Sequence, residues 1–315
     1  MHLARADHDA CLWGRDAVLV ADMSERRANA VYLPDIRFPD RLRVTDDLAD
    51  ALRDTDLVIA AVPSHGTREI LKRASSLIRP GATVVSATKG LEQDTLFRMS
   101  DVIEQELGSE MHVAVLSGPS FATELARQLP TAVSVASRDA ATVERVQADF
   151  RTGYFRLYGT SDVVGVEIGG ALKNIIAIAA GVTEGLALGH NALAGLITRG
   201  LAEITRLACA AGARRDTLAG LAGLGDLVLT CTGALSRNRH VGVELARGRS
   251  VDDVLSGMKM VAEGVRTANA ALQLGARHDI ELPITAQVAE LLAGRKDART
   301  ALYDLMLRPQ RSEAG

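Results

Sequence analysis

The chain has 315 residues, of which 47% are hydrophobic, 3% are aromatic and 24% are charged, and its formal net charge is −3. This length allows two domains of about 150 residues each, with cores built from Ala, Leu and Val rather than from aromatic side chains. Acidic and basic residues are interspersed and form no basic stripe. The composition therefore argues against a nucleic acid as the main partner.

Several features of the sequence predict a cytoplasmic protein. No run reaches the roughly 20 consecutive apolar residues that a membrane-spanning helix needs, so we expect no membrane span. The first residues carry charges where a signal peptide would have its apolar segment. Cys11, Cys209 and Cys231 are too widely spaced for a disulfide framework or a zinc site, and they predict reduced thiols and no bound metal.

Short apolar runs alternate with helical stretches in the first half of the chain. The predicted strands are Ala10–Trp13, Asp56–Val62, Thr83–Ala87, Val113–Leu116 and Ala132–Ala136. Because these runs are apolar throughout, we expect them to be buried on both faces of a parallel sheet. The alternation predicts an α/β fold, a Rossmann-like doubly wound sheet, over residues 1–160.

The second half is rich in Ala and Leu and has helical spacing. The predicted helices are Glu167–Leu186, Ala192–Ala211, Arg239–Ala246, Ala262–Leu274 and Ile284–Ala293. Few β-branched runs interrupt them, so we expect an all-helical C-terminal domain over residues 161–315 that binds substrate.

Polar loops follow the predicted strands of the first domain. Val62–His65, Ala87–Leu91 and Ser117–Ala122 each place small or hydroxyl residues between a strand and a helix. Ligands of open α/β sheets bind beyond the carboxyl ends of the strands, where helix N-termini favour anions. Lys89 adds a positive charge, although a lone lysine in a turn is often simply solvated. Together the loops favour a phosphorylated ligand.

Lys173 lies within an apolar helical stretch, three residues after Gly170 in a motif that begins with Gly169. Burial disfavours the ammonium form, so such a lysine can transfer a proton near neutral pH. The two glycines allow another backbone or a cofactor to approach closely. The alternative is a lysine whose stem is buried while its ammonium group reaches the surface.

Two polar segments of the second half complete the candidate site. Gly223–Thr232 is a glycine-rich turn in which Asp226 could orient a lysine or a substrate hydroxyl. Ser236–Arg239 combines an arginine guanidinium group with hydroxyl and amide donors, and this combination suits a phosphate bound at the start of a helix. An ordinary helix cap with solvated charges has the same pattern, so the alternative stays open.

These and further motifs occur along the chain in the same order as in one known protein family. They are Asn29–Asp35, Pro63–His65, Thr88–Glu92, Ser117–Leu125, Gly169–Asn174, Ile197–Glu203, Gly223–Cys231 and Ser236–Arg239. The chain resembles the bacterial NAD(P)-dependent glycerol-3-phosphate dehydrogenases over nearly its whole length. The resemblance implies reversible hydride transfer between NAD(P)H and dihydroxyacetone phosphate, which gives sn-glycerol 3-phosphate for glycerophospholipid synthesis.

The resemblance also implies roles for individual residues. Lys173 matches the proton-transfer residue of the family. Substrate-binding positions match Lys89, Gly118, Ser120, Lys173, Asp226, Ser236, Arg237 and Asn238. Cofactor-binding positions match Arg15, Lys89, Ala122, Arg237, Val261 and Glu263. The resemblance implies NADP or NAD as the cofactor, and Arg15 makes NADP plausible because it could pair with a 2′-phosphate. A homodimer is possible.

The beginning of the chain departs from the family pattern. No Gly-x-Gly-x-x-Gly turn is present, and Met1–Ala6 resembles the end of the first family helix. We therefore expect the first strand of the sheet to be missing and NADPH to bind weakly. Either the start codon is assigned too late, or the chain is a truncated, weakly active or inactive relative that serves as a helical interaction module.

A further alternative is another NADP-dependent hydroxy-acid dehydrogenase with the same two-domain plan, such as a 6-phosphogluconate or ketopantoate reductase type. The segments Thr88–Leu91 and Ser236–Arg239 favour the triose phosphate over those substrates.

Overall fold

The computed structural model describes residues 1–258, 261–310 and 312. The chain folds into two compact units. The first unit comprises Met1–Lys89 and Phe97–Glu167, and the second comprises Gly90–Leu96 and Ile168–Gly315. The helix α8 (Val163–Gly185) runs through the last boundary between the two units, which lies between Glu167 and Ile168. No linker therefore separates the units near residue 160, where the expected domain boundary lay.

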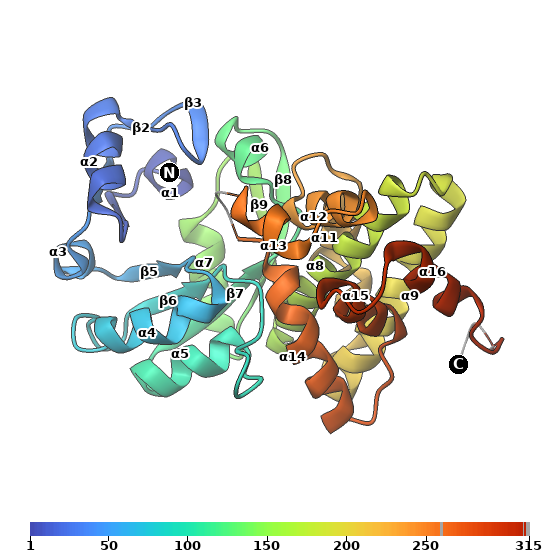
Figure 1. The fold of residues 1–315 in the computed structure, drawn as a ribbon. Helices are drawn as coiled ribbons and strands as arrows, with labels where there is room; N and C mark the ends of the chain where they lie inside the picture. Colours follow the sequence, from blue (N-terminus) through green and yellow to red (C-terminus); the bar gives the residue numbers. More distant parts are fainter. Residues whose placement is uncertain (259–260, 311, 313–315) are drawn as a thin grey trace. The chain divides into compact units, whose positions relative to one another are not determined.

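The first unit contains a five-stranded sheet with the order β5-β6-β7-β8-β9 (Figure 1). Its strands are β5 (Leu57–Ala60), β6 (Thr83–Ser86), β7 (His112–Ser117), β8 (Thr131–Ala136) and β9 (Phe155–Thr160). β5, β6 and β7 are parallel, whereas β8 is antiparallel to β7 and parallel to β9. The Rossmann-like α/β class is confirmed. β8 reverses direction because the five-residue helix α6 (Ala122–Ala126) does not return the chain across the sheet.

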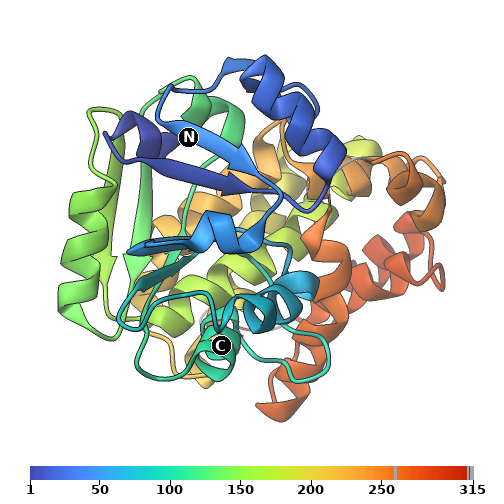
Figure 2. The same cartoon turned by 90° about the vertical axis from the view of Figure 1, so that its left-hand side faces the viewer.

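Four further strands precede this sheet. They are β1 (Ala10–Trp13), β2 (Ala28–Asn29), β3 (Leu33–Arg37) and β4 (Leu42–Thr45). β1 pairs with β4 in parallel and β2 pairs with β3 antiparallel (Figure 2). Among the described residues, β1 is paired on one side only, with β4, and β5 on one side only, with β6. The strand predicted at Ala10–Trp13 is confirmed, and its partner β4 was not anticipated.

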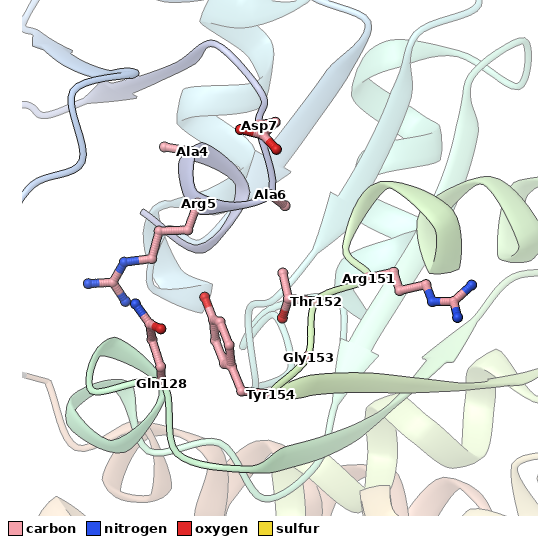
Figure 3. A pocket seen from close by; sticks show the side chains of 9 residues that line it. All are labelled: Ala4, Arg5, Ala6, Asp7, Gln128, Arg151, Thr152, Gly153 and Tyr154. Carbon is pink, nitrogen blue, oxygen red and sulfur yellow. The ribbon is translucent and has the colours of Figure 1, made fainter.

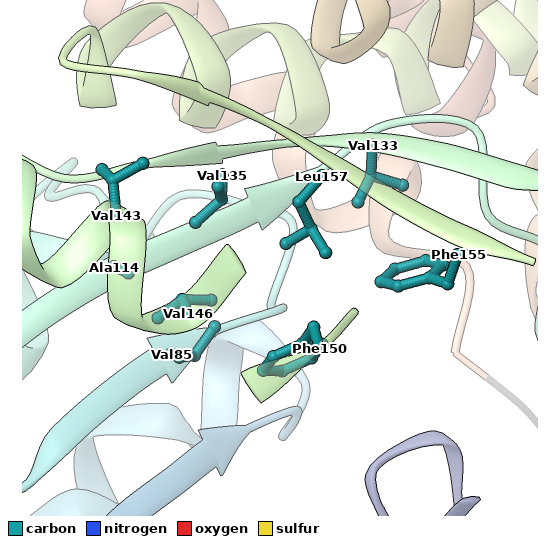
Figure 4. Packing of buried hydrophobic residues seen from close by; sticks show 9 residues of the cluster. All are labelled: Val85, Ala114, Val133, Val135, Val143, Val146, Phe150, Phe155 and Leu157. Carbon is teal, nitrogen blue, oxygen red and sulfur yellow. The ribbon is translucent and has the colours of Figure 1, made fainter. Parts of the chain in front are cut away.

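Helices pack against the strands of the first unit and form its core clusters with them. The helices are α1 (His2–Arg5), α2 (Ala17–Arg26), α3 (Leu48–Leu52), α4 (Ser64–Ala74), α5 (Met99–Leu107), α6 and α7 (Ala140–Asp149). Val85 and Val135 of the sheet lie against Val146 of α7, with Phe150 and Phe155 at the end of the cluster (Figure 4). The apolar runs that predicted strands therefore supply this core.

The second unit is helical in its described part, as expected. Besides α8 it contains α9 (Gly189–Ala210), α10 (Arg215–Ala219), the π-helical turn η1 (Leu221–Gly225), α11 (Asp226–Thr232), α12 (Arg237–Ala246), α13 (Val251–Ser256), α14 (Glu263–Arg277), α15 (Pro283–Leu292) and α16 (Ala298–Met306). A buried carboxylate joins two of these helices. Glu203 of α9 accepts backbone hydrogen bonds from Ile284 and Thr285 at the start of α15, both at 2.9 Å. It thereby caps a helix to which it does not belong.

α8 is the apolar centre of the fold. Within the described residues it is the one helix long and apolar enough to cross a membrane, with a mean hydropathy of 1.6. However, 89% of its apolar window is buried inside the protein. Leu172, Ile175 and Ile178 of this helix are at most 1% exposed. These values are those of a core helix.

Candidate active site

The carboxyl ends of β5, β6 and β7 lie at one edge of the sheet of the first unit because these strands are parallel. The Thr88 hydroxyl donates to the carbonyl of Val62 at 2.7 Å and so joins the loops that follow β5 and β6. The Lys89 ammonium donates to the carbonyl of Gly118 at 3.3 Å and joins the loops that follow β6 and β7. The predicted loops therefore lie together on one rim.

This rim presents several of the predicted residues. The Ser120 hydroxyl donates to the carbonyl of Gly118 at 3.0 Å, within the loop that contains Lys89's partner. Ala122 is exposed at the first position of α6, which has no side-chain N-cap. Arg15 is exposed in the loop before α2, next to the capping residue Asp16. Lys89, Gly118 and Ser120 are thus brought together by contacts, and Arg15 lies on the β1–β4 part of the unit.

Lys173 of α8 is buried, with 6% of the residue exposed. Its ammonium donates to Oδ1 of Asp226 at 2.5 Å and to the hydroxyl oxygen of Thr230 at 2.7 Å. Asp226 and Thr230 are themselves buried, at 1% and 4% exposure. The alternative of a lysine reaching the surface is therefore wrong, because the carboxylate of Asp226 supplies the opposite charge inside the protein.

The backbone around Gly169 explains how Asp226 reaches Lys173. A Cβ atom on Gly169 would lie 2.9 Å from the carbonyl oxygen of Ala222 in η1, so α8 and η1 touch backbone to backbone. The π-helical turn η1 leads directly into α11, which begins at Asp226 and carries Thr230 one turn later. The close approach predicted for the glycines before Lys173 is confirmed at Gly169.

The segment at the start of α12 combines a helix cap with a charged side chain. Ser236 is the N-cap, and its hydroxyl oxygen accepts from the backbone N–H of Arg239 at 3.2 Å. Arg237 occupies the first helical position and is exposed. Desolvation by the surrounding protein lowers the pKa of its guanidinium, and the charge of Glu263 acts in the opposite direction. Arg239 forms an ion pair with Glu184 at 2.9 Å.

Asn238 is buried between three helices. Its Nδ2 donates to Oδ1 of Asn174 at 3.0 Å, and its Oδ1 accepts from the backbone N–H of Gly264 at 3.0 Å. Asn174 directly follows Lys173, and Glu263 directly precedes Gly264 at the start of α14. Val261 is half-buried just before that helix. Asn174 and Thr230 were not predicted as site residues from the sequence, although both lie inside predicted motifs.

α8 and α12 approach each other unusually closely beyond this point. A Cβ atom on Gly242 would lie 1.9 Å from the carbonyl oxygen of Ile178, and one on Gly181 would lie 1.9 Å from that of Arg239. Such distances are far below van der Waals contact, so both positions require glycine. The close crossing brings the short side chains of Asn174 and Asn238 within hydrogen-bond distance.

An open pocket of about 630 Å³ lies elsewhere in the first unit, lined by residues that include Arg5, Gln128, Arg151 and Tyr154 (Figure 3). Its two arginines do not converge. Arg5 donates to the carbonyl of Ala126 at 2.7 Å, and the Arg151 side chain points away from Arg5 (Figure 3). None of the predicted site residues lines this pocket.

The cysteines offer no reactive thiolate at the site. Cys231 in α11 is buried, and desolvation raises the pKa of its thiol to about 12, although Lys173 and Arg239 act in the opposite direction. The thiol therefore stays protonated at neutral pH. Among the described residues, no group of three or more His, Cys, Asp or Glu side chains could hold a metal ion.

An α/β unit with polar loops at the carboxyl edge of its sheet, together with a helical unit that buries a Lys–Asp pair, defines a two-domain dehydrogenase class. Family models agree with this class. The NAD-dependent glycerol-3-phosphate dehydrogenase N-terminus matches residues 1–143, and the C-terminus of the same family matches residues 162–303. The chain belongs to the NAD-dependent glycerol-3-phosphate dehydrogenase family.

Curated relatives are similar over nearly the whole chain. The glycerol-3-phosphate dehydrogenase (NAD(P)+) of Myxococcus xanthus is 51% identical over 304 residues, which are 96% of this chain and 91% of the relative. The enzyme of the same name from Geobacter sulfurreducens is 50% identical over 99% of this chain and 93% of its own length. These comparisons do not support the expectation of a lost N-terminal segment.

Solved structures have the same fold. The crystal structure of glycerol-3-phosphate dehydrogenase from Coxiella burnetii has a TM-score of 0.94 and 39% identity, and the match covers 98% of this chain and 94% of that one. A ketopantoate reductase from Ralstonia eutropha has a TM-score of 0.62 at 16% identity over 96% of this chain and 94% of that one. The second likeness concerns the fold alone.

Proposed function

We propose that this protein interconverts dihydroxyacetone phosphate and sn-glycerol 3-phosphate with NAD(P)H, and so supplies glycerophospholipid synthesis. The observation that carries the proposal is the buried ion pair of Lys173 and Asp226, 2.5 Å apart, in a member of this family. The residues that follow Lys173 and Arg237, namely Asn174 and Asn238, are hydrogen-bonded to each other. The proton donor Lys173 and the guanidinium of Arg237 therefore lie on neighbouring helices.

Lys173 acts as the general acid in the reductive direction. Reduction of the ketone places negative charge on the carbonyl oxygen, and the ammonium of Lys173 transfers a proton to that oxygen. Asp226 and Thr230 orient the ammonium, and the carboxylate compensates its charge inside the protein. In the oxidative direction the neutral amine accepts the proton from the hydroxyl. The nicotinamide supplies or accepts the hydride when it is bound.

The phosphate of the substrate binds at the start of α12. Ser236, Arg237 and Asn238 occupy the N-cap and the first helical positions, where backbone N–H groups and a guanidinium favour an anion. The substrate-binding residues that we propose in the first unit are Lys89, Gly118 and Ser120 on its rim.

A nicotinamide dinucleotide fits the described residues of the rim. α4 and α6 both begin at the carboxyl edge of the sheet without a side-chain cap, so their first-turn N–H groups suit anionic and amide groups of such a cofactor. The residues of the first unit that we propose to contact it are Arg15, Lys89 and Ala122. The exposed guanidinium of Arg15 favours NADP over NAD, because it can pair with a 2′-phosphate.

A substrate comparison tests this function. Oxidation of NADPH by the chain is followed spectrophotometrically with dihydroxyacetone phosphate or with ketopantoate, and K173A is the inactive control. We expect turnover with the triose phosphate that disappears in K173A. Turnover with ketopantoate instead would assign the other hydroxy-acid dehydrogenase class. Binding of neither substrate in isothermal calorimetry would favour the helical interaction module.

The proposed setting is a cytoplasmic enzyme of small-molecule metabolism, and we propose a homodimer as its assembly. Light scattering coupled to size-exclusion chromatography measures the mass in solution. A mass near the 33.4 kDa of one chain would exclude the dimer.

A further inference from the structure

Thr88 lies in the loop after β6 and is buried, at 8% exposure. Its hydroxyl donates to the carbonyl oxygen of Val62 at 2.7 Å, and the carbonyl oxygen of Ala60 lies 3.3 Å away. Ala60 is the last residue of β5, and Val62 lies in the loop that follows it. One buried side chain therefore extends the contact between β5 and β6 past their last paired residues.

The chain leaves the first unit directly after this anchor. Lys89, which follows Thr88, is the last residue of the first unit before Gly90–Leu96, and that segment belongs to the second unit. Within the second unit, the guanidinium of Arg277 in α14 donates to the carbonyl oxygen of Thr95 at 3.1 Å and holds the segment. The Thr88 hydroxyl therefore anchors the chain to the sheet one residue before Lys89.

We propose that Thr88 is a positioning residue that acts on the ligands through Lys89. Its hydroxyl fixes the backbone from which the Lys89 side chain extends, so that the ammonium stays at the carbonyl oxygen of Gly118, 3.3 Å away. This inference rests on the proposed function, in which Lys89 binds the substrate and the cofactor. Thr88 itself is buried below the rim and contacts neither ligand.

The acceptor of the Lys89 ammonium is held firmly as well. A Cβ atom on Gly118 would lie 2.8 Å from the Cα atom of Val133 in β8, so the backbone at Gly118 packs directly against the neighbouring strand. The hydroxyl of Ser120 donates to the same carbonyl oxygen at 3.0 Å. Lys89 is thus placed from both ends, and a long side chain that is placed beforehand loses less rotamer entropy when a ligand binds.

The hydrogen bond of Thr88 is the shorter of two that the carbonyl oxygen of Val62 accepts. The other comes from the hydroxyl of Thr67 in α4, at 3.4 Å. Without the Thr88 hydroxyl this half-buried carbonyl would keep only the longer contact. An acceptor that has lost its partner favours movement of its loop toward water, so we expect the loop after β6 to shift and to carry Lys89 with it.

Steady-state kinetics of T88V and T88S test the inference. Valine keeps the branched shape of threonine without its hydroxyl, whereas serine keeps the hydroxyl. We expect T88V to raise KM for dihydroxyacetone phosphate about tenfold with kcat within about threefold, because a misplaced binding group weakens the ground state and the transition state alike. T88S should stay within about threefold of the wild type in both constants. A wild-type KM in T88V would overturn the proposal.

Thr205 of α9 supplies the matched control. It is 7% exposed, and its hydroxyl donates to the carbonyl oxygen of Leu201 at 2.7 Å, so T205V removes a hydrogen bond of the same kind and length in the second unit. We expect both T205V and T88V to unfold at a lower temperature than the wild type, but KM to rise in T88V alone. An equal rise of KM in T205V would mean that general destabilisation explains T88V, and the proposal would be wrong.

A double-mutant cycle with K89A identifies the residue through which Thr88 acts. The four proteins are compared in the same assay and by fluorescence titration with NADPH, which measures cofactor binding without turnover. We expect T88V to weaken NADPH binding in the wild-type background but to change KM and the Kd for NADPH by less than about twofold in the K89A background, because coupled residues are not additive. Losses that multiply would show that Thr88 acts independently of Lys89.

Thermal unfolding shows whether T88V folds. If it does not, T88A and T88S provide the same comparison, because they differ only in the hydroxyl group, and equal KM values in these two variants would overturn the proposal. Retained turnover in K173A would instead refute the proposed function. A wild-type KM in T88V together with an inactive K173A would refute this inference alone.

Discussion

The ammonium of Lys173 lies 2.5 Å from Oδ1 of Asp226, and the two side chains are only 8% and 2% exposed. Both groups left water when the protein folded, so each depends on the other for compensation of its charge. Thr230 accepts a further hydrogen bond from Lys173 at 2.7 Å. The pair therefore links the stability of the helical unit to its proposed chemistry, and the two can be separated by mutation.

Replacing Asp226 by Asn should leave a buried ammonium without its counter-charge. We expect the free energy of unfolding to fall by about 3–5 kcal/mol, as for other broken buried pairs. Chemical denaturation measures it. The double variant K173M/D226L removes both charges and should regain most of the lost stability without regaining turnover. A double variant as unstable as D226N would show that packing, rather than charge, is decisive.

Replacing Lys173 by Ala should abolish the proton transfer. We expect kcat to fall by roughly 100- to 10,000-fold, the usual contribution of a positioned general acid. Steady-state kinetics with dihydroxyacetone phosphate measures this. Lys296, whose ion pair with Asp304 is partly exposed, supplies the matched control, and K296A should retain wild-type turnover. An unchanged kcat in K173A would remove the basis of the mechanism.

Glu167 should make the stability of the first unit depend on pH. Desolvation raises the pKa of Glu167 to about 6 from 4.5, against the opposing effects of Arg98 and Ser100, and Asp101 raises it further. Because the folded state then binds the proton more tightly than the unfolded state, the free energy of unfolding should fall as pH rises from 4.5 to 6, by about 2 kcal/mol.

The variant E167Q isolates this contribution. Its neutral amide cannot ionise, so the difference in unfolding free energy between E167Q and wild type should grow in favour of E167Q between pH 4.5 and 6 and then level off. Denaturant titrations at several pH values measure it. A difference that stays constant with pH would mean that Glu167 has an ordinary pKa.

Gly242→Ala should separate α8 from α12, because the added methyl group would lie 1.9 Å from the carbonyl oxygen of Ile178. We expect a loss of about 1–3 kcal/mol in stability, typical of overpacking, and a loss of turnover as the Asn174–Asn238 contact lengthens. Gly195 on α9 has open space around it, so G195A should instead stabilise the protein by about 0.5–1 kcal/mol. Equal stability of the two variants in thermal unfolding would contradict the close crossing.

Patterns along the chain predicted four of the five strands of the main sheet. β5 to β8 were found as continuous apolar runs, and of these β6 is buried at every position. β9 was missed because it alternates, with Phe155 and Leu157 buried and Arg156 and Tyr158 exposed. The antiparallel direction of β8 was also missed, since direction depends on the connection rather than on the strand.

The candidate site divides in the same way. That Lys89 and Gly118 lie on one rim could be foreseen, because the ends of successive parallel strands meet at one edge. The contacts of Asn174 and Thr230 could not be foreseen, because the sequence does not show which distant residue will pair with a polar residue of an apolar helix. Their partners come from helices more than fifty residues away in the chain.

By itself, the sequence determined the class of the fold, the order of its units and the identity of the charged residues, because these follow from local apolar patterns and recognisable motifs. Only the tertiary structure decided that Lys173 is paired with Asp226 inside the protein and that Asn238 is engaged with Asn174 and Gly264. The physical reason is that hydrogen bonds and buried ion pairs tolerate changes of only a few tenths of an ångström in the distance between their atoms. Those distances are set by how closely α8, α11, α12 and α14 pack.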